Sequence, residues 1–116
     1  LEMNTESDWR TRPVGGIGIV GLDHVAVTDR WERDGKSAAS RYFEQVGGPV
    51  PVALMAMARL GLEESPRFAG VIGEDDAGLT ISRELCSEGV DESCLQAHFP
   101  ANTPRSLVVL CGGSRA

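Results

Sequence analysis

The chain has 116 residues, 41% of them hydrophobic and 24% charged, which is the composition of one ordinary folded domain rather than of a disordered segment. Its formal net charge of −6 argues against nucleic acid and anionic membranes as partners. No stretch approaches the roughly 18 apolar residues of a membrane span. Three cysteines without a Cys-x-x-Cys motif argue against a disulfide framework or a zinc site, so we expect reduced thiols and a cytoplasmic location.

The N-terminus carries no predicted structure. A methionine at position 3 suggests that Leu1 and Glu2 remain from expression, and the polar run from 4 to 12 lacks the apolar core of a signal peptide. We expect residues 1–15 to be this remnant and a disordered tail, and residues 16–116 to be structured.

The first structured segment is predicted to be extended. Val14 to Val27 is rich in β-forming residues that glycines interrupt, which predicts a buried strand, a turn near Leu22-Asp23 and a second extended stretch. The charged residues that follow end in the turn dipeptide Asp34-Gly35, and residues 36–46 are again extended. The stretch from about 28 to 46 is therefore predicted to be a hairpin outside the main core.

A helix is predicted from Val50 to Leu60, because helix formers dominate there and Pro51 fits the first turn. Gly61 is placed to end it. The segment is apolar on nearly all faces, which is typical of a buried helix.

The second half of the chain alternates strands and helices. Arg67–Gly73 is predicted to be a strand, Asp75 or Asp76 to begin a helix that Gly89 ends, and residues 95–99 and 103–111 to be strands. Gly112 to Ser114 signals a hairpin turn. This order indicates an α/β sheet. Because the chain stops where the last hairpin should return, we expect the protein to continue past Ala116.

Residues 16–21, with glycines at 16, 18 and 21, match the dinucleotide-binding pattern G-x-G-x-x-G. In that fingerprint the glycines follow a strand and open a helix, whereas here they lie within an extended segment. A Rossmann oxidoreductase is therefore only a third alternative. His24 and His98, which are 74 positions apart, are better explained as ordinary positions than as a metal pair, and we predict no metal site.

Three positions are candidates for ligand binding. Asp23 is predicted to follow the first strand, where a carboxylate could accept hydrogen bonds from two hydroxyls of a polyol, although an Asx-turn would explain it too. Gly47-Gly48 precedes the predicted helix and would let a ligand approach its backbone N–H groups, although a plain loop-to-helix turn is equally compatible. The acidic residues 74–76 are better explained as helix caps than as a metal site.

Several segments together are similar to the ribokinase-like (pfkB) carbohydrate kinases. Gly47-Gly48 followed by an alanine-rich helix ending in Leu60-Gly61 resembles the first family signature. Residues 68–78 and 85–91 resemble a second pattern, G-x-x-G-x-D-x-x-G with a later Gly-Val-Asp. Thr103-Pro104 with the strand after it, and the strand ending at Asp23, also resemble the family. The resemblance covers about residues 17–115.

The resemblance implies a three-layer α/β/α Rossmann-like (ribokinase-like) sheet with a small β lid at about 28–46, here truncated. It implies transfer of the ATP γ-phosphoryl group to a hydroxymethyl group of a sugar or nucleoside, with ATP and Mg²⁺ as cofactors. Asp23, Gly47 and Gly48 are the implied substrate-binding residues, and Asp34 is a looser match to lid carboxylates. In several members two lids clasp, so a homodimer through the lid is a further implication.

The chain departs from this family at important positions. Val52 stands where the family has its signature Asn, and Pro49, Val50 and Pro51 replace small or polar residues. Valine cannot hydrogen-bond a sugar hydroxyl. The family's G-x-G-D motif, which supplies the general base and anion hole, does not occur in residues 1–116, so we assign no catalytic residue to this segment. A non-catalytic ribokinase-fold protein that binds a ligand or partner therefore remains the alternative.

Overall fold

A computed structural model describes residues 8–112 and 114–115 of the chain. Leu1, Glu2 and the first part of the predicted tail lie outside the described residues. Trp9–Thr11 forms a short 3-10 turn, where a disordered tail was expected. The reason is local: the Asp8 carboxylate accepts the Arg10 N–H at 3.1 Å and pairs with its guanidinium at 2.9 Å. The Arg10 carbonyl in turn accepts the N–H of Glu63 at 2.9 Å, which ties this turn to the rest of the fold.

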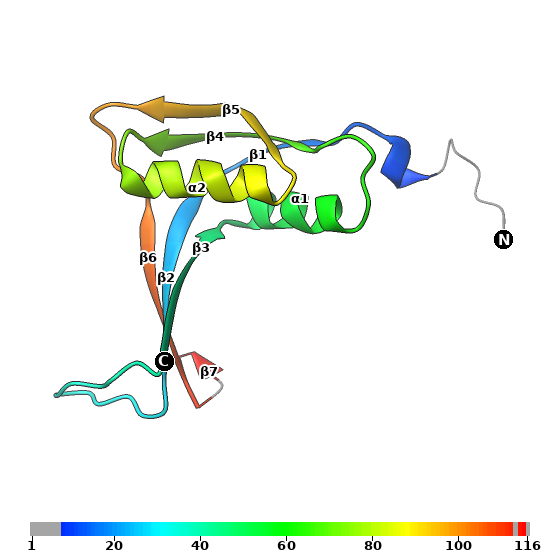
Figure 1. Cartoon of the computed structure of the whole chain (residues 1–116). Coiled ribbons are helices and arrows are strands. Elements are labelled where there is room, and N and C mark those ends of the chain that lie inside the picture. Colours follow the sequence, from blue (N-terminus) through cyan, green and yellow to red (C-terminus); the bar gives the residue numbers. More distant parts are fainter. Residues whose placement is uncertain (1–7, 113, 116) are drawn as a thin grey trace, which may run out of the picture.

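The chain forms two separate sheets whose strands run in different directions, as Figure 1 shows. The first is parallel and has the order β1-β4-β5, with strands β1 (Gly15–Ile17), β4 (Arg67–Gly73) and β5 (Asp91–His98). The second has the order β3-β2-β6-β7, with strands β2 (Gly21–Thr28), β3 (Arg41–Gly47), β6 (Arg105–Cys111) and β7 (Ser114–Arg115). In it β2 pairs antiparallel with β3 and parallel with β6. The hairpin predicted at about 28–46 is thus one part of a larger sheet that begins at Gly21.

The predicted position of the first turn was wrong. The break between β1 and β2 falls at residues 18–20, and Leu22 and Asp23 lie inside β2. Gly18 sits against the Val50 side chain, where a Cβ would come within 2.9 Å of it, and Val20 is only 2% exposed. Because Gly18 has no Cβ, the chain can pass closely against Val50 of α1 and enter the second sheet there.

Two helices cover one face of the first sheet (Figure 1). They are α1 (Pro49–Arg59) and α2 (Asp76–Ser87), as the sequence predicted to within a residue or so. Their inner faces form the core with residues of β4 and of the second sheet. The buried core residues are Val20, Leu22, Val46, Leu54, Phe68, Ile72, Ala77, Ile81, Leu85 and Val90. The fully buried side chains of this core include Phe68, Ile81 and Leu85.

The expectation that α1 is buried on all faces was wrong for the described chain. Only Pro51 and Leu54 of this helix are buried, and Val52 is 46% exposed. The other face of the first sheet is open as well, with Ile17 82% exposed. The α/β class is confirmed, and residues 8–112 and 114–115 supply one helix layer and the sheet of the three layers expected. No helix in that part of the chain is long and apolar enough to span a bilayer.

Candidate functional site

Asp23 and Gly47 lie side by side where the second sheet meets the helices. A Cβ built on Gly47 would lie 2.6 Å from each carboxylate oxygen of Asp23. The strand register explains the contact, because Gln45 of β3 pairs with Asp23 and Gly47 pairs with Gly21. Asp23 was predicted to follow the first strand. This prediction was wrong, because Asp23 is the third residue of β2. The reason is the earlier break at residues 18–20, which makes Asp23 part of the second sheet.

Gly48 is required by backbone geometry. Its φ is +117°, and a Cβ there would lie 2.5 Å from the Ile19 carbonyl oxygen. It is the N-cap of α1, and no side chain caps this helix. The predicted glycine pair therefore lets β3 turn directly into α1 beneath Asp23.

The first turn of α1 offers fewer donors than expected. Pro49 and Pro51 have no N–H, and the Val52 N–H donates to the Gly48 carbonyl at 3.2 Å. Among the first four residues of α1, this leaves the Val50 N–H as the one donor available to a ligand. A ligand at this corner would therefore depend more on the Asp23 carboxylate than on helix N–H groups.

Asp34 is not brought beside this pair. It lies in the exposed connection between β2 and β3, at the end of the second sheet far from the helices (Figure 1). The five residue steps of β2 from Asp23 to Thr28 alone span about 17 Å. The two carboxylates therefore do not converge on one small ligand within the described chain.

One neighbour of the site was not found from the sequence. Glu84 of α2 accepts the N–H of Val46, the residue before Gly47, at 3.0 Å. Burial of Glu84 raises its carboxyl pKa, and the bond from Val46 opposes this shift. The contact links α2 to the strand that carries the glycine pair. A glutamate among other polar residues of a helix gives no sequence signal for such a bond.

The acidic segment after β4 is structural, as predicted. Asp75 is the N-cap of α2 and accepts the Gly78 N–H at 2.8 Å. It also accepts the Thr103 hydroxyl and N–H, and these hydrogen bonds hold the Asp75 carboxyl pKa below its usual value. Thr103 accepts the Gly73 N–H at 2.9 Å, which closes the network.

The other sequence motifs have structural roles too. Gly16 lies in β1 and Gly21 begins β2, so no helix opens after the G-x-G-x-x-G pattern and the dinucleotide alternative is not supported. His24 bonds to the Tyr42 hydroxyl at 2.7 Å, and His98 contacts Gln96 at 3.4 Å. Within residues 8–112 and 114–115, no three His, Cys, Asp or Glu side chains are grouped to hold a metal ion.

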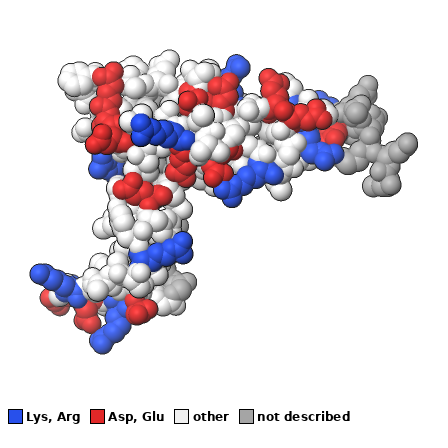
Figure 2. Space-filling model, in the orientation of Figure 1, with Lys and Arg blue, Asp and Glu red and all other residues white. Residues whose placement is uncertain are grey.

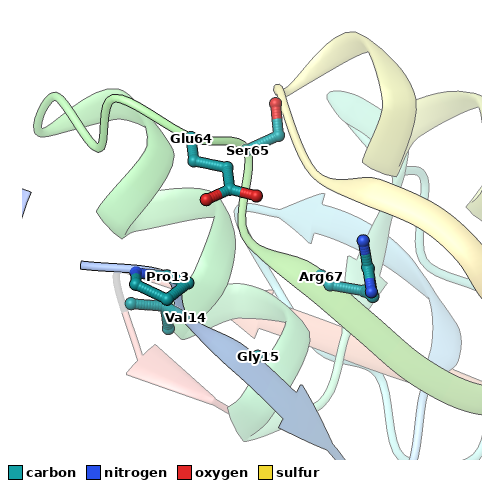
Figure 3. A pocket seen from close by; sticks show the side chains of 6 residues that line it. All are labelled: Pro13, Val14, Gly15, Glu64, Ser65 and Arg67. Carbon is teal, nitrogen blue, oxygen red and sulfur yellow. The ribbon is translucent and has the colours of Figure 1, made fainter. Parts of the chain in front are cut away.

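One cavity of the chain lies at the other end of the first sheet. A hollow of about 240 Å³ opens at the amino ends of β1 and β4 (Figure 3). Figure 3 shows the Glu64 carboxylate reaching into it, whereas the Arg67 guanidinium points elsewhere and bonds to Asp91 at 3.2 Å. Ligands of open α/β sheets gather at the carboxyl ends of strands, so we do not assign this hollow as the substrate site. Figure 2 shows acidic and basic side chains interspersed over the face in view.

Comparison with solved structures identifies the fold. A candidate ribokinase from Agrobacterium tumefaciens matches with a TM-score of 0.80 at 22% identity, over 91% of this chain and 35% of its own. A ribokinase from Cryptococcus neoformans, solved with ADP, matches with 0.70 at 23%, over 91% and 33%. A fructokinase from Xylella fastidiosa, solved with ATP, matches with 0.70 at 23%, over 91% and 32%. No protein-family model matches the chain.

The chain therefore has the ribokinase-like fold, as the resemblance in the sequence implied. It spans about a third of the length of the kinases that it matches.

Proposed function

We propose that this chain is the substrate-binding part of an ATP-dependent carbohydrate kinase of the ribokinase-like (pfkB) family. The second sheet, β3-β2-β6-β7, is the proposed lid. The observation that carries the proposal is the contact between Asp23 and Gly47 in this sheet, which sets a carboxylate against a side-chain-free stretch of backbone. A carboxylate can accept hydrogen bonds from two neighbouring hydroxyls, and the missing Cβ of Gly47 leaves room for the Asp23 carboxylate to lie against the backbone at this corner.

The proposed reaction transfers the ATP γ-phosphoryl group to a hydroxymethyl group of a sugar or nucleoside. The G-x-G-D motif that this family uses for catalysis does not occur in residues 1–116. We therefore assign no catalytic step to them. Their proposed part is to bind and orient the hydroxyls of the substrate through Asp23, Gly47 and Gly48, whereas Asp34, at the far end of the second sheet, does not reach the same small ligand. The ATP and ADP complexes of kinases with this fold support nucleotide use by the complete enzyme.

A homodimer through the lid belongs to this proposal. The lid sheet carries Leu107, which is 73% exposed, and Tyr42, which is 56% exposed. A second lid packed against these side chains would remove apolar area from water.

A non-catalytic binding protein is the second candidate, and the first turn of α1 favours it. Val52 offers no hydrogen bond, and Pro49 and Pro51 remove two backbone donors. A site with so few donors would bind a hydroxyl-rich sugar weakly, because unmet hydroxyls are costly in a closed site.

Binding and catalysis need separate tests. Titration of the ¹⁵N-labelled chain with ribose, fructose and adenosine should shift the amide signals of residues 21–24, 46–48 and 50 for the correct ligand. Asp23→Asn should weaken that binding roughly tenfold or more, since a charged acceptor is lost, whereas the exposed control Asp29→Asn should leave it unchanged.

Catalysis is tested on the polypeptide encoded by the whole reading frame. ADP release with one of these substrates, abolished or strongly reduced by Asp23→Asn, supports the kinase. Ligand-induced shifts in the chain without any ADP release by the longer polypeptide would instead establish the binding protein. The absence of both would contradict the proposal.

A further inference from the structure

A second surface of the chain lies between α2 and β5, away from Asp23. A groove of about 350 Å³ runs between this helix and the strand. Its apolar walls include Leu79 of α2, which is 50% exposed, and Leu95 and Ala97 of β5. Leu95 pairs with Gly70 and Ala97 with Ile72, so both lie on the face of the sheet that α2 covers. Apolar side chains therefore line a groove that α2 leaves partly open.

The strand beside the groove is a sheet edge. β5 lies at the outside of the first sheet (Figure 1) and, among residues 8–112 and 114–115, pairs only with β4. Its pairing with β4 is regular from Cys94 to His98, after a register shift near its start. An edge strand presents unpaired N–H and C=O groups to which another extended chain can bond.

Carboxylates mark the two ends of the groove. Glu92 lies at the start of β5, and Glu74 follows the end of β4, which runs parallel to β5. The third acid of the lining, Asp75, already accepts bonds from Thr103 and Gly78. The described lining contains no lysine or arginine. The lining residues are Ile72, Gly73, Glu74, Asp75, Gly78, Leu79, Ser82, Glu92, Leu95 and Ala97.

We propose that this groove docks an extended segment of another protein, which adds a strand to β5. The segment has apolar residues at alternate central positions and a lysine or arginine at each end. The apolar side chains fill the space between Leu79 and Leu95, and the basic ends meet Glu92 and Glu74. A second copy of this chain fits less well, because a symmetric contact would place these same carboxylates against each other. The proposal is independent of sugar binding.

The test uses the 116-residue chain and a synthetic seven-residue peptide with Lys at both ends and Val at alternate central positions, separated by Thr. Two peptides serve as controls, one with Glu ends and one with Ser in place of Val. We expect the first peptide to shift the amide signals of β5 and α2, and both controls to bind at least about tenfold more weakly.

Variants separate the groove from general charge attraction. Leu79→Gln should weaken binding about tenfold by removing an apolar anchor. Leu107→Gln, at a more exposed leucine of the second sheet, should not. Glu92→Lys should weaken binding of the Lys-ended peptide and strengthen that of the Glu-ended one. The exposed control Glu63→Lys should do neither. Because Leu79 is half exposed, its variant should keep the circular dichroism spectrum of the parent chain.

Three results would overturn the proposal. The first is absence of binding up to a peptide concentration on the order of millimolar. The second is equal binding by the Leu79→Gln variant and the parent. The third is a dimer in sedimentation velocity that Leu79→Gln dissociates, which would assign the groove to a second copy.

Discussion

The carboxylate of Asp75 holds Thr103, 28 positions later in the chain, by two hydrogen bonds: it accepts the Thr103 N–H at 2.9 Å and its hydroxyl at 2.6 Å. Thr103 is only 4% exposed, and its oxygen accepts the Gly73 N–H. One side chain thus joins the end of β4, the start of α2 and the loop that leads into β6. Since β6 lies next to β2 in the second sheet, this network is one of the links between the first sheet with its helices and the second sheet.

Replacement of Thr103 by valine should destabilise the chain. The substitution keeps the shape of the side chain but leaves the buried Gly73 N–H without its acceptor, which costs about 1–3 kcal/mol. Urea denaturation followed by circular dichroism measures the loss. Thr80→Val is the control, because the Thr80 hydroxyl is exposed and donates only to the Asp76 carbonyl within α2. Equal stabilities of the two variants would show that the Thr103 network contributes nothing.

The same network should make stability depend on pH. The pKa of Asp75 is lowered from its usual value of 3.8, first by the Thr103 hydroxyl and then by the N–H groups of Thr103 and Gly78. A carboxyl with a lowered folded-state pKa stabilises the fold above pH 3.8, and this contribution is lost as the pH falls through the lower folded-state value. The unfolding free energies of the parent and of Asp75→Asn should therefore differ at pH 7 and approach each other below about pH 4. A constant difference from pH 3 to pH 7 would contradict this account.

Gly78→Ala should destabilise the fold, although alanine in place of glycine usually stabilises a helix. Glycine in a helix interior is about 1 kcal/mol less favourable than alanine. A Cβ on Gly78, however, would overlap the Gly73 carbonyl oxygen and press on Thr103. We expect Gly78→Ala to lower the free energy of unfolding by about 1–3 kcal/mol, the usual cost of overpacking. A raised thermal midpoint would show that β4 and α2 can separate without cost.

Sequence reasoning located α1, β4 and α2 well because their signals are local. A helix-forming run between Pro51 and Gly61, and an aspartate ahead of an apolar stripe, mark their own ends. The break between β1 and β2 could not be placed in this way, because every residue from 14 to 27 is compatible with an extended chain. What fixes it is Val50 lying over Gly18, a contact between segments 32 positions apart. The exposure of Val52 was missed for a related reason, since composition does not tell which neighbours a helix has.

The candidate site was predicted in part for the same reasons. The glycine pair was recognisable from its place before a helix, and Asp23 from its resemblance to a family strand. That the two touch follows from the register of β2 and β3, which pairs Gly21 with Gly47. The role of Glu84 could not be predicted from the sequence, because its hydrogen bond to Val46 joins positions 38 apart in the chain.

Glu84 can be tested by comparing glutamine with alanine. Burial raises the pKa of this carboxyl above its usual 4.5, so its contribution to stability is largest below that pH and is lost as the pH rises through the folded-state value. Glutamine keeps an oxygen for the Val46 N–H and removes the charge, so Glu84→Gln should equal or exceed the parent in stability at pH 7. Glu84→Ala loses the acceptor and should cost about 1 kcal/mol. Chemical denaturation at pH 7 measures both, and equal losses would show that the hydrogen bond has no role.

Gly47→Ala tests the proposed substrate site most directly. The new Cβ would occupy the space in which the Asp23 carboxylate now lies, so the carboxylate must move. Because no positive φ is needed at Gly47, unlike at Gly48, the backbone can accept alanine and the fold should survive. Affinity for the sugar or nucleoside that the chain binds should fall about tenfold or more, as measured by amide shifts on titration. Gly35→Ala is the matched control, because a Cβ there makes only an ordinary contact at 3.7 Å with Glu32 in the connection between β2 and β3. Unchanged affinity in a folded Gly47→Ala variant would mean that the substrate does not depend on the position of Asp23, and the assignment of this corner as the sugar site would be wrong.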